Sequence, residues 1–319
     1  MALPINAATL PLVIGARWLA MLFRLRGTEM LFRFLFPPGA PPPRSFEVYI
    51  EELRYRGNTA HFIDWNILLY GAYEEADLLM MKTFARADDV DVFLDIGANL
   101  GQHAIYLSGA VKRVIAFEPN AQLHEQFHDN IARNDIGNID IHAVAMGGTD
   151  GMGTLYLGAD SGGSSLLASV NSPDNVMPIE VVVRTGDSFL GERLDGAKVG
   201  LIKIDVEGYE AQVLNGLAET IHANRPVIAI EISAAGREQF GSVENFAASF
   251  PHAYVFYMWH KAGVVRRKSG IGAFPLETVF AGYGNVYAVP REKRDRFERA
   301  AACRPSRMRH RRMSFVRIL

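Results

Sequence analysis

The sequence of 319 residues has room for one large or two ordinary globular domains. It is 49% hydrophobic and 21% charged, a composition typical of globular proteins. The net charge of −2 argues against a general affinity for nucleic acid, and the single cysteine, Cys303, excludes an intrachain disulfide framework and a cysteine-based metal site.

The N-terminal segment at 10–36 is strongly hydrophobic but contains arginine. Arg17, Arg24 and Thr28 fall on one face of a predicted helix. The segment is too short and too basic to span a bilayer, which takes about 20 apolar residues. Two interpretations stay open: a helix lying in the plane of a membrane surface, or a helix packed on the domain or on another subunit.

A proline-rich stretch then predicts a stiff spacer that ends an N-terminal helical extension at 1–45. Residues 46–70 predict an irregular lead-in of strands and turns, because hydrophobic residues alternate near its end. A helix is predicted to begin near Tyr73 and Glu74 and to run to about Arg86. The acids suit a helix start, although Tyr73 and Glu74 could instead cover a cofactor.

The chain is organised around a buried strand predicted at 90–96 and the turn that follows it. This turn carries Gly97, Asn99 and Gly101 two residues apart. Glycine and asparagine tolerate positive φ angles most readily, so the turn can be tight and can present its backbone to a ligand. A short helix and a second buried strand at 114–117 are predicted next.

The second strand closes with Glu118, 21 residues after Gly97. Strand, glycine turn, helix, strand and terminal acid form the unit that binds an adenosine-type cofactor, with the acid accepting hydrogen bonds from the ribose. A dinucleotide fingerprint needs glycine where this chain has Asn99 and Gln102. S-adenosylmethionine has a cationic sulfonium and amino group but no pyrophosphate, so Asp95 at the strand end and fewer glycines suit it better.

A third strand is predicted at 139–144, and its end at Val144 should border the adenine pocket. Further strands are predicted at 154–157 and 179–183. The loop at 161–165 between them is rich in serine and glycine. It has two open interpretations, a simple surface loop or a lid that touches cofactor or substrate.

A buried strand at 201–204 ends at Asp205, and Glu207 and Glu210 follow it closely. Ligands of open α/β sheets bind at the carboxyl ends of the strands, so Asp205 and Glu207 are candidate active-site acids. No paired histidines at metal-ligand spacing are present, and we predict no tightly held metal, although a divalent ion held by these acids stays open. Later strands are predicted at 227–231, 254–259 and 285–289.

The C-terminal tail at 291–319 contains eleven Lys or Arg residues and three acids. Its basic residues suggest either an anionic surface such as lipid headgroups or a disordered tail. The domain prediction is therefore an N-terminal extension at 1–45, a catalytic domain at 46–290 and this basic tail. The simplest location is the cytoplasm, with peripheral contact at the inner membrane face through 10–36 and 291–319.

Four motifs in this order resemble the FkbM family of S-adenosylmethionine-dependent methyltransferases, and the likeness covers roughly residues 71–290. They are Asp95 to Gly101, Phe117 to Asn120, Ser164-Ser165 and Lys203 to Glu210. The resemblance implies the α/β fold of class I methyltransferases: a seven-stranded, mostly parallel sheet with helices on both faces and one antiparallel strand near the end. It also implies O-methylation of a hydroxyl on a sugar, polyketide or lipid-linked glycan.

The resemblance also assigns roles to residues, with S-adenosylmethionine as cofactor. Asp205 and Glu207 would lie beside the reacting centre. The cofactor would be bound by Asp95, Gly97, Asn99, Gly101, Glu118, Asn120, Tyr73, Glu74, Val144 and Asp205. Two other functions stay open: a nicotinamide-dependent oxidoreductase, which the missing glycines disfavour, and a non-catalytic, membrane-docked protein that keeps the cofactor pocket for stability. The sequence gives no prediction of the acceptor's identity or of the oligomeric state.

Overall fold

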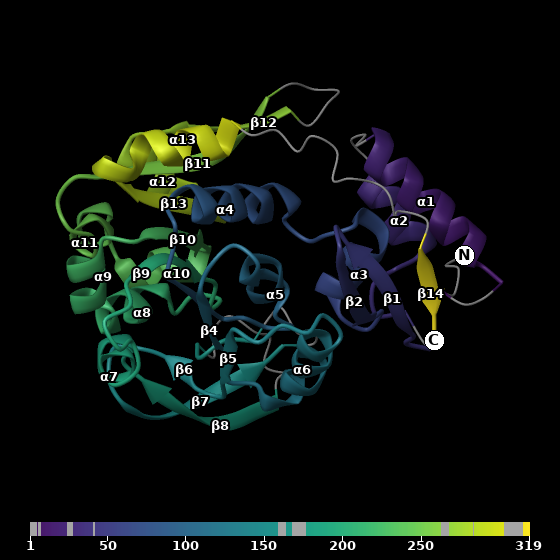
Figure 1. The fold of residues 1–319 in the computed structure, drawn as a ribbon, viewed down its shortest axis with the longest axis horizontal. Helices are drawn as coiled ribbons and strands as arrows, with labels where there is room; N and C mark the ends of the chain where they lie inside the picture. Colours follow the sequence, from purple (N-terminus) through teal and green to yellow (C-terminus); the bar gives the residue numbers. More distant parts are fainter. Residues whose placement is uncertain are drawn as a thin grey trace.

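A computed structural model describes residues 5, 8–23, 28–40, 42–158, 164–167, 177–262, 268–282, 284–302 and 315–319. Eight strands form the central sheet: β3 (Val92–Ile96), β4 (Arg113–Phe117), β5 (Ile139–His142), β9 (Val199–Ile204), β10 (Val227–Ile232), β11 (Tyr254–Ala262), β12 (Lys268–Ala273) and β13 (Gly284–Pro290). Their order is β12-β11-β13-β10-β9-β3-β4-β5 (Figure 1). The run from β10 to β5 is parallel, and β13 is antiparallel to both of its neighbours.

The predicted α/β fold, with its mostly parallel sheet and late antiparallel strand, is confirmed. The sheet has one more strand than the expected seven because β12 pairs with β11 as an edge hairpin. Burial of both faces explains why β3, β4, β9 and β10 are continuous apolar runs rather than alternating ones.

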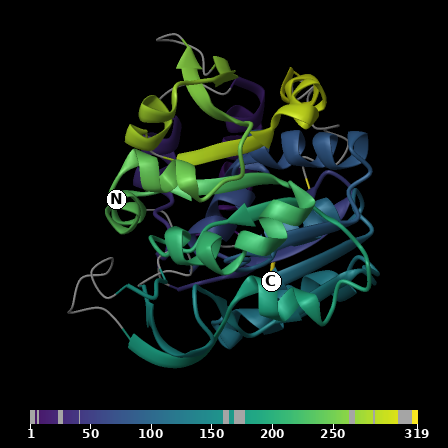
Figure 2. The same ribbon diagram turned by 90° about the vertical axis from the view of Figure 1, so that its left-hand side faces the viewer.

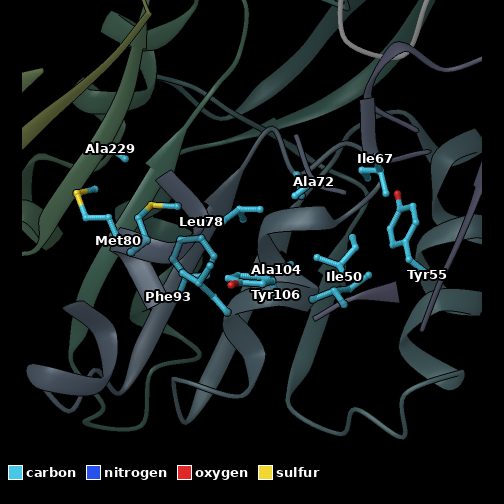
Figure 3. Close-up of a cluster of buried hydrophobic side chains, with 14 of the residues drawn as sticks. Ile50, Tyr55, Ile67, Ala72, Leu78, Met80, Phe93, Ala104, Tyr106 and Ala229 are labelled. Atoms are coloured by element: carbon cyan, nitrogen blue, oxygen red, sulfur yellow. The ribbon is translucent and has the colours of Figure 1, made fainter. Parts of the chain in front are cut away.

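Helices cover both faces of the sheet (Figure 2). Successive strand residues point to opposite faces, so Phe93 packs in one hydrophobic cluster and Leu94 in the other. Phe93 meets Leu78, Met80, Ala104 and Tyr106 (Figure 3). The helices on that face are α4 (Glu75–Ala87), α5 (Gln102–Ser108), α6 (His124–Ala132, after the 3-10 turn η1 at Ala121–Leu123) and α13 (Arg294–Ala302). Those on the other face are α7 (Gly186–Gly191), α8 (Glu210–Gly216), α9 (Ala218–Asn224), α10 (Ala234–Phe240), α11 (Val243–Ala248) and α12 (Leu276–Ala281).

A second sheet, in the order β14-β1-β2, joins the two ends of the chain. Its strands are β1 (Ser45–Ile50), β2 (Leu53–Asn58) and β14 (Val316–Ile318), and it is grouped with α1 (Leu10–Phe23), α2 (Thr28–Leu35) and α3 (Phe62–Tyr70) (Figure 1). The strand-and-turn prediction for 46–70 is correct for β1 and β2 and wrong for α3. Trp65 and Ile67 to Leu69 are all buried, so this helix packs on several sides and lacks a one-sided hydrophobic pattern.

Arg17 points into the protein. It is 1% exposed, and its guanidinium donates to the carbonyl oxygens of Ile67 at 2.7 Å and Leu68 at 2.6 Å, near the end of α3. The interpretation in which Arg17 belongs to an exposed, lipid-facing stripe is therefore wrong, because its donors satisfy carbonyls of α3. Arg24 lies outside the described residues, as does the side chain of Thr28. No helix in the described ranges is long and apolar enough to cross a membrane.

The first part of the predicted tail is folded. The 3-10 turn η5 (Arg291–Lys293) leads into α13, where Phe297 is 1% exposed and packs against Phe84 and Tyr287. The expectation of disorder is wrong for these residues, because Phe297 contributes to the core. Arg304, Arg307, Arg309, Arg311 and Arg312 lie outside the described residues.

A third sheet, in the order β6-β8-β7, borders the carboxyl end of β5. Its strands are β6 (Ala145–Met146), β7 (Gly151–Leu157) and β8 (Met177–Arg184), so the predicted strands at 154–157 and 179–183 lie outside the central sheet. Ser165 is 1% exposed and forms an isolated bridge with Tyr156. Residues 161–163 of the predicted lid lie outside the described part of the chain.

Candidate active site

A cavity of about 330 Å³ opens at the carboxyl ends of β3, β4, β9 and β10. This is the sheet edge at which ligands of open α/β folds bind. Seven of the predicted site residues are in its wall: Tyr73, Gly97, Asn99, Glu118, Val144, Asp205 and Glu207. The strand order therefore gathers residues that are far apart in the sequence.

The loop after β3 uses positive φ angles at every second residue. The φ angles are 81° at Gly97, 52° at Asn99 and 78° at Gly101. A Cβ atom on Gly97 would lie 1.8 Å from the carbonyl oxygen of Asp205, and one on Gly101 would lie 2.1 Å from the Phe127 ring. Only glycine fits at these two positions. Asn99 stabilises its own turn, because its Oδ1 accepts from the amide of Leu100.

Glu118 is held in place by backbone amides. Its Oε2 accepts from the Asn99 amide at 2.9 Å, and its Oε1 accepts from the Asn120 amide at 2.8 Å. Burial raises the pKa of Glu118 to about 7, against the lowering effect of these two hydrogen bonds. A carboxylate oriented in this way has lone pairs left for ligand hydroxyls.

Four predicted cofactor residues do not line the cavity, and three of them, Asp95, Gly101 and Asn120, support residues that do. Asp95 is 1% exposed and is the cross-strand neighbour of Lys203, and burial raises its pKa to about 6. Gly101 shapes the loop, and the Asn120 side chain caps the turn after β4 by accepting from the Gln122 amide. Each of these three residues positions a neighbouring residue of the loop or strand and does not itself line the cavity.

Gln102 holds the segment before α4 beside the cavity through two hydrogen bonds. Its side-chain oxygen accepts from the Tyr73 amide at 2.8 Å, and its side-chain nitrogen donates to the Tyr73 carbonyl at 2.9 Å. Tyr73 lines the cavity, whereas Glu74 does not. Glu74 instead accepts from the Asn285 side chain at 2.7 Å and lies 3.6 Å from Nε2 of His103.

An ion pair lies at the end of β9. Lys203 Nζ is 2.6 Å from Asp205 Oδ2, with side-chain exposures of 5% and 25%. Burial alone would raise the pKa of Asp205, but Lys203 outweighs it and lowers that pKa to about 2. The neighbouring charge of Asp205, together with burial, raises the pKa of Glu231 to about 10. The two acids therefore carry different charges at neutral pH.

Glu207 occupies a left-handed backbone position, with φ at 52°. Its carbonyl oxygen accepts from the Ser165 hydroxyl at 2.7 Å, which joins the short serine segment to the strand end. Ser164 and Ser165 both line the cavity. Positive φ at a residue other than glycine is uncommon and concentrates at functional sites.

Comparison with protein-family models matches residues 95–261, just over half of the chain, to the methyltransferase FkbM domain. The chain belongs to the FkbM methyltransferase family. The resemblance noted in the sequence is thereby confirmed. This membership also disfavours the nicotinamide-dependent oxidoreductase.

Known relatives of this FkbM methyltransferase match it over part of their length. Methyltransferase 1 of Beauveria bassiana is 28% identical over 147 residues, which cover 40% of this chain and 59% of that protein. The hexuronic acid methyltransferase AglP of Haloferax volcanii is 28% identical over 148 residues, covering 46% of this chain and 58% of that protein. The chain thus spans less than two thirds of the length of these curated relatives.

Solved structures show similarity at low sequence identity. A methyltransferase FkbM from Methylobacillus flagellatus shares 18% identity with a TM-score of 0.41, covering 63% of this chain and 44% of that chain. The O-methyltransferase TomG of Streptomyces achromogenes, in complex with S-adenosylmethionine, shares 12% identity with a TM-score of 0.39. The match covers 69% of this chain and 81% of that chain.

Some residues of the FkbM site were not assigned from the sequence. Lys203, Glu231 and His103 all line the cavity. Glu231 could have been predicted from the sequence, because it lies near the end of the buried strand β10. Asp205 follows the buried strand β9 in a similar way. Lys203 could not have been predicted, because a lysine one residue before a strand end is ordinarily exposed and here it is 4% exposed.

Proposed function

We propose that this FkbM protein is an S-adenosylmethionine-dependent methyltransferase that methylates a hydroxyl oxygen. The observation that carries the proposal is the placement of Glu118, whose two oxygens are oriented by the amides of Asn99 and Asn120 at the cavity wall. Ribose hydroxyls are donors that such a carboxylate accepts. The glycine loop beside it leaves the backbone open to a ligand.

The cavity suits a cationic cofactor. Both carboxylate oxygens of Asp95 are buried and make no hydrogen bond of normal geometry within the described ranges. Asp205 and Glu207 follow β9, on the side of β3 away from β4 and Glu118, and we place the methionine end of the cofactor there, with Asp95 on β3 beside them. An amino group and a sulfonium are favourable next to these acids. In this assignment, Val144 borders the adenine and Tyr73 covers the bound cofactor.

S-adenosylmethionine supplies a methyl group attached to a positively charged sulfur. As the acceptor oxygen forms its bond to the methyl carbon, the sulfur–carbon bond breaks and its electron pair stays on sulfur. Holding the two reactants in line supplies much of the rate. We assign Asp205 to orienting the acceptor hydroxyl as a hydrogen-bond acceptor. Glu207, the next acid along the chain, takes the proton and passes it to water.

A sugar hydroxyl is our preferred acceptor, either free or on a lipid-linked glycan, with a polyketide hydroxyl as the next choice. The name of the relative AglP, a hexuronic acid methyltransferase, supports a carbohydrate. The lining also mixes polar groups with the apolar side chains of Phe62, Ile63 and Leu166. Such a wall can bind the apolar face of a sugar ring and hydrogen-bond its hydroxyls.

Two measurements test the proposal. Titration calorimetry should show binding of S-adenosylmethionine and no binding of NAD. Transfer of labelled methyl to a panel of uronic acid glycans and lipid extracts should then identify the acceptor. Full activity in Asp205→Asn would refute the role of Asp205. Tight cofactor binding without turnover on any hydroxylated acceptor would favour the non-catalytic alternative.

Peripheral membrane contact through 10–36 and 291–319 and the domain division at 45 and 290 stay predictions. The large exposed side chains of Met30, Leu31 and Phe34 on α2 favour such contact, whereas the buried Arg17 favours packing on α3. Co-sedimentation of the full chain with anionic vesicles, compared with Phe34→Ser, tests the contact. Equal partition of the two proteins would argue against it.

A further inference from the structure

Three carboxylates meet at the carboxyl ends of β9 and β10. Asp205, Glu207 and Glu231 each place one oxygen so that the three oxygens lie within 4.8 Å of one another, and all three residues line the cavity. Two oxygens on opposite sides of one ion, with bonds of about 2.1 to 2.4 Å, are about 4.2 to 4.8 Å apart. Small side-chain rotations would therefore bring the three oxygens onto a single cation.

The charges around these acids leave room for a divalent ion. Lys203 is the only lysine or arginine among the described residues that line the cavity, and it contacts one oxygen of Asp205, Oδ2. The other oxygen of Asp205 is outside that ion pair. If the ion displaces the proton that Glu231 holds in its absence, three ionised carboxylates and one ammonium give a local charge of −2, which one divalent cation would balance.

A second and independent observation comes from α5 on the other wall. His103 is 7% exposed and lines the same cavity, yet its Nε2 makes no hydrogen bond within the described part of the chain. The nearest acid, Glu74 Oε2, is 3.6 Å away and is itself without a hydrogen bond there. A buried polar atom without a hydrogen bond on a residue of the cavity wall points to a ligand held there.

We propose that Asp205, Glu207 and Glu231 bind one oxygen-preferring divalent cation, Mg²⁺ or Mn²⁺, and that the acceptor hydroxyl binds to this ion. The role of the ion rests on the proposed methyl transfer, whereas its binding does not. Six-coordinate ions of this kind use few protein carboxylates and keep other positions for water or substrate. A bound cation stabilises the alkoxide that develops when the hydroxyl loses its proton. The sequence predicted no tightly held metal but left open a divalent ion held by Asp205 and Glu207, and the structure adds Glu231 to that pair.

Manganese binding to the full-length protein is the direct test. Loss of the free Mn²⁺ signal in electron paramagnetic resonance should show one bound ion per chain. Glu231→Gln keeps the size of the side chain and should weaken binding by about tenfold or more, as changes at metal sites commonly do. Glu238→Gln is the matched control, because Glu238 is an exposed glutamate on the next helix, α10. Thermal melting should show that both variants are folded.

Calorimetric titration of S-adenosylmethionine into the same three proteins separates the two hypotheses. Ion binding by the wild type and Glu238→Gln but not by Glu231→Gln, with cofactor binding retained in all three, supports the site. Normal cofactor binding without ion binding in the wild type overturns the site and leaves the proposed function intact. Equal ion binding by Glu231→Gln also overturns it. Failure of the wild type to bind the cofactor overturns the proposed function. The presence or absence of ion binding then still decides whether the ion site exists.

Discussion

Lys203 Nζ lies 2.6 Å from Asp205 Oδ2, at the strand end that faces the cavity. The lysine keeps Asp205 ionised, with its pKa at about 2 in spite of burial. A carboxylate with so low a pKa is a strong hydrogen-bond or metal acceptor and a weak base. Asp205 is therefore better suited to orienting a hydroxyl than to removing its proton.

Replacing Lys203 by Met should destabilise the protein by about 3 kcal/mol at pH 7, because a buried acid loses its partner. The pKa of Asp205 should then rise, so the deficit should shrink as the pH falls towards 5. In the wild type, the contribution of Asp205 is present above its ordinary pKa of 3.8 and is lost only as the pH falls towards 2. Urea unfolding of the wild type and the variant at pH 5 and pH 8 measures the loss of stability at each pH. The exposed Lys198→Met is the control, and an equal loss in both variants would contradict the prediction.

Gly97→Ala should abolish cofactor binding and destabilise the fold. The added methyl would lie 1.8 Å from the Asp205 carbonyl oxygen, at a φ of 81° that L residues rarely adopt. Backbone strain of this kind costs about 1–3 kcal/mol before the clash is counted. Gly109→Ala is the matched control, since its Cβ would meet nothing within 4 Å. Thermal melting and calorimetry of both variants check the prediction, and normal binding by Gly97→Ala would refute it.

Glu118→Gln should weaken S-adenosylmethionine binding by about tenfold to a hundredfold, because a charge-assisted hydrogen bond is worth about 1.5–3 kcal/mol. The amide nitrogen of the new side chain would also face the amide of Asn99 or Asn120, two donors that need an acceptor. Calorimetry measures the change. The exposed Glu125→Gln on α6 should bind as the wild type does, and unchanged affinity in Glu118→Gln would rule out ribose recognition by this residue.

The cofactor loop could be predicted because its information is local. Gly97, Asn99 and Gly101 adopt the positive φ angles that their residue types favour, and Glu118 ends the adjacent strand as its spacing indicates. Such features depend on neighbours a few residues away. The same holds for the buried strands, which are apolar except for one charged residue near the carboxyl end of β3, β9 and β10.

The rest of the site depends on pairing between distant segments. The order β3-β9-β10 places Lys203 next to Asp95 and brings Glu231 to the same edge as Asp205. The sequence spacing of these residues does not encode that order. Packing also explains Arg17, a basic residue in an apolar helix that donates hydrogen bonds to buried carbonyls instead of facing lipid.

Arg17→Met should detach α1 from α3. The variant keeps the length of the side chain but leaves the carbonyls of Ile67 and Leu68 without their buried donor, which costs about 1–3 kcal/mol for each unsatisfied group. Hydrogen exchange in α1 should speed up, while exchange in β3 should stay slow. The exposed Arg86→Met is the control. Unchanged protection of α1 would mean that the helix is held by apolar packing alone.

The free protein should lose stability as the pH rises from 6.5 to 8.5. Burial raises the pKa of Glu118 and Glu210 to about 7 and that of Glu74 to about 8. The unfolded chain has already released these protons, with a pKa near 4.5, so the folded state holds more of them in this window and stability falls with pH.

At about 1.4 kcal/mol for each pKa unit, a loss of about 2 kcal/mol is expected by pH 8.5. Working above pH 6.5 leaves only the upper half of the titration of the unfolded chain's histidines, which acts in the opposite direction. Urea unfolding across this range measures the slope, and Glu118→Gln should flatten it because the variant cannot ionise there. A slope of zero in the wild type would mean that these buried carboxyl groups are ionised in the folded protein, and that the cavity is already compensated by positive charge.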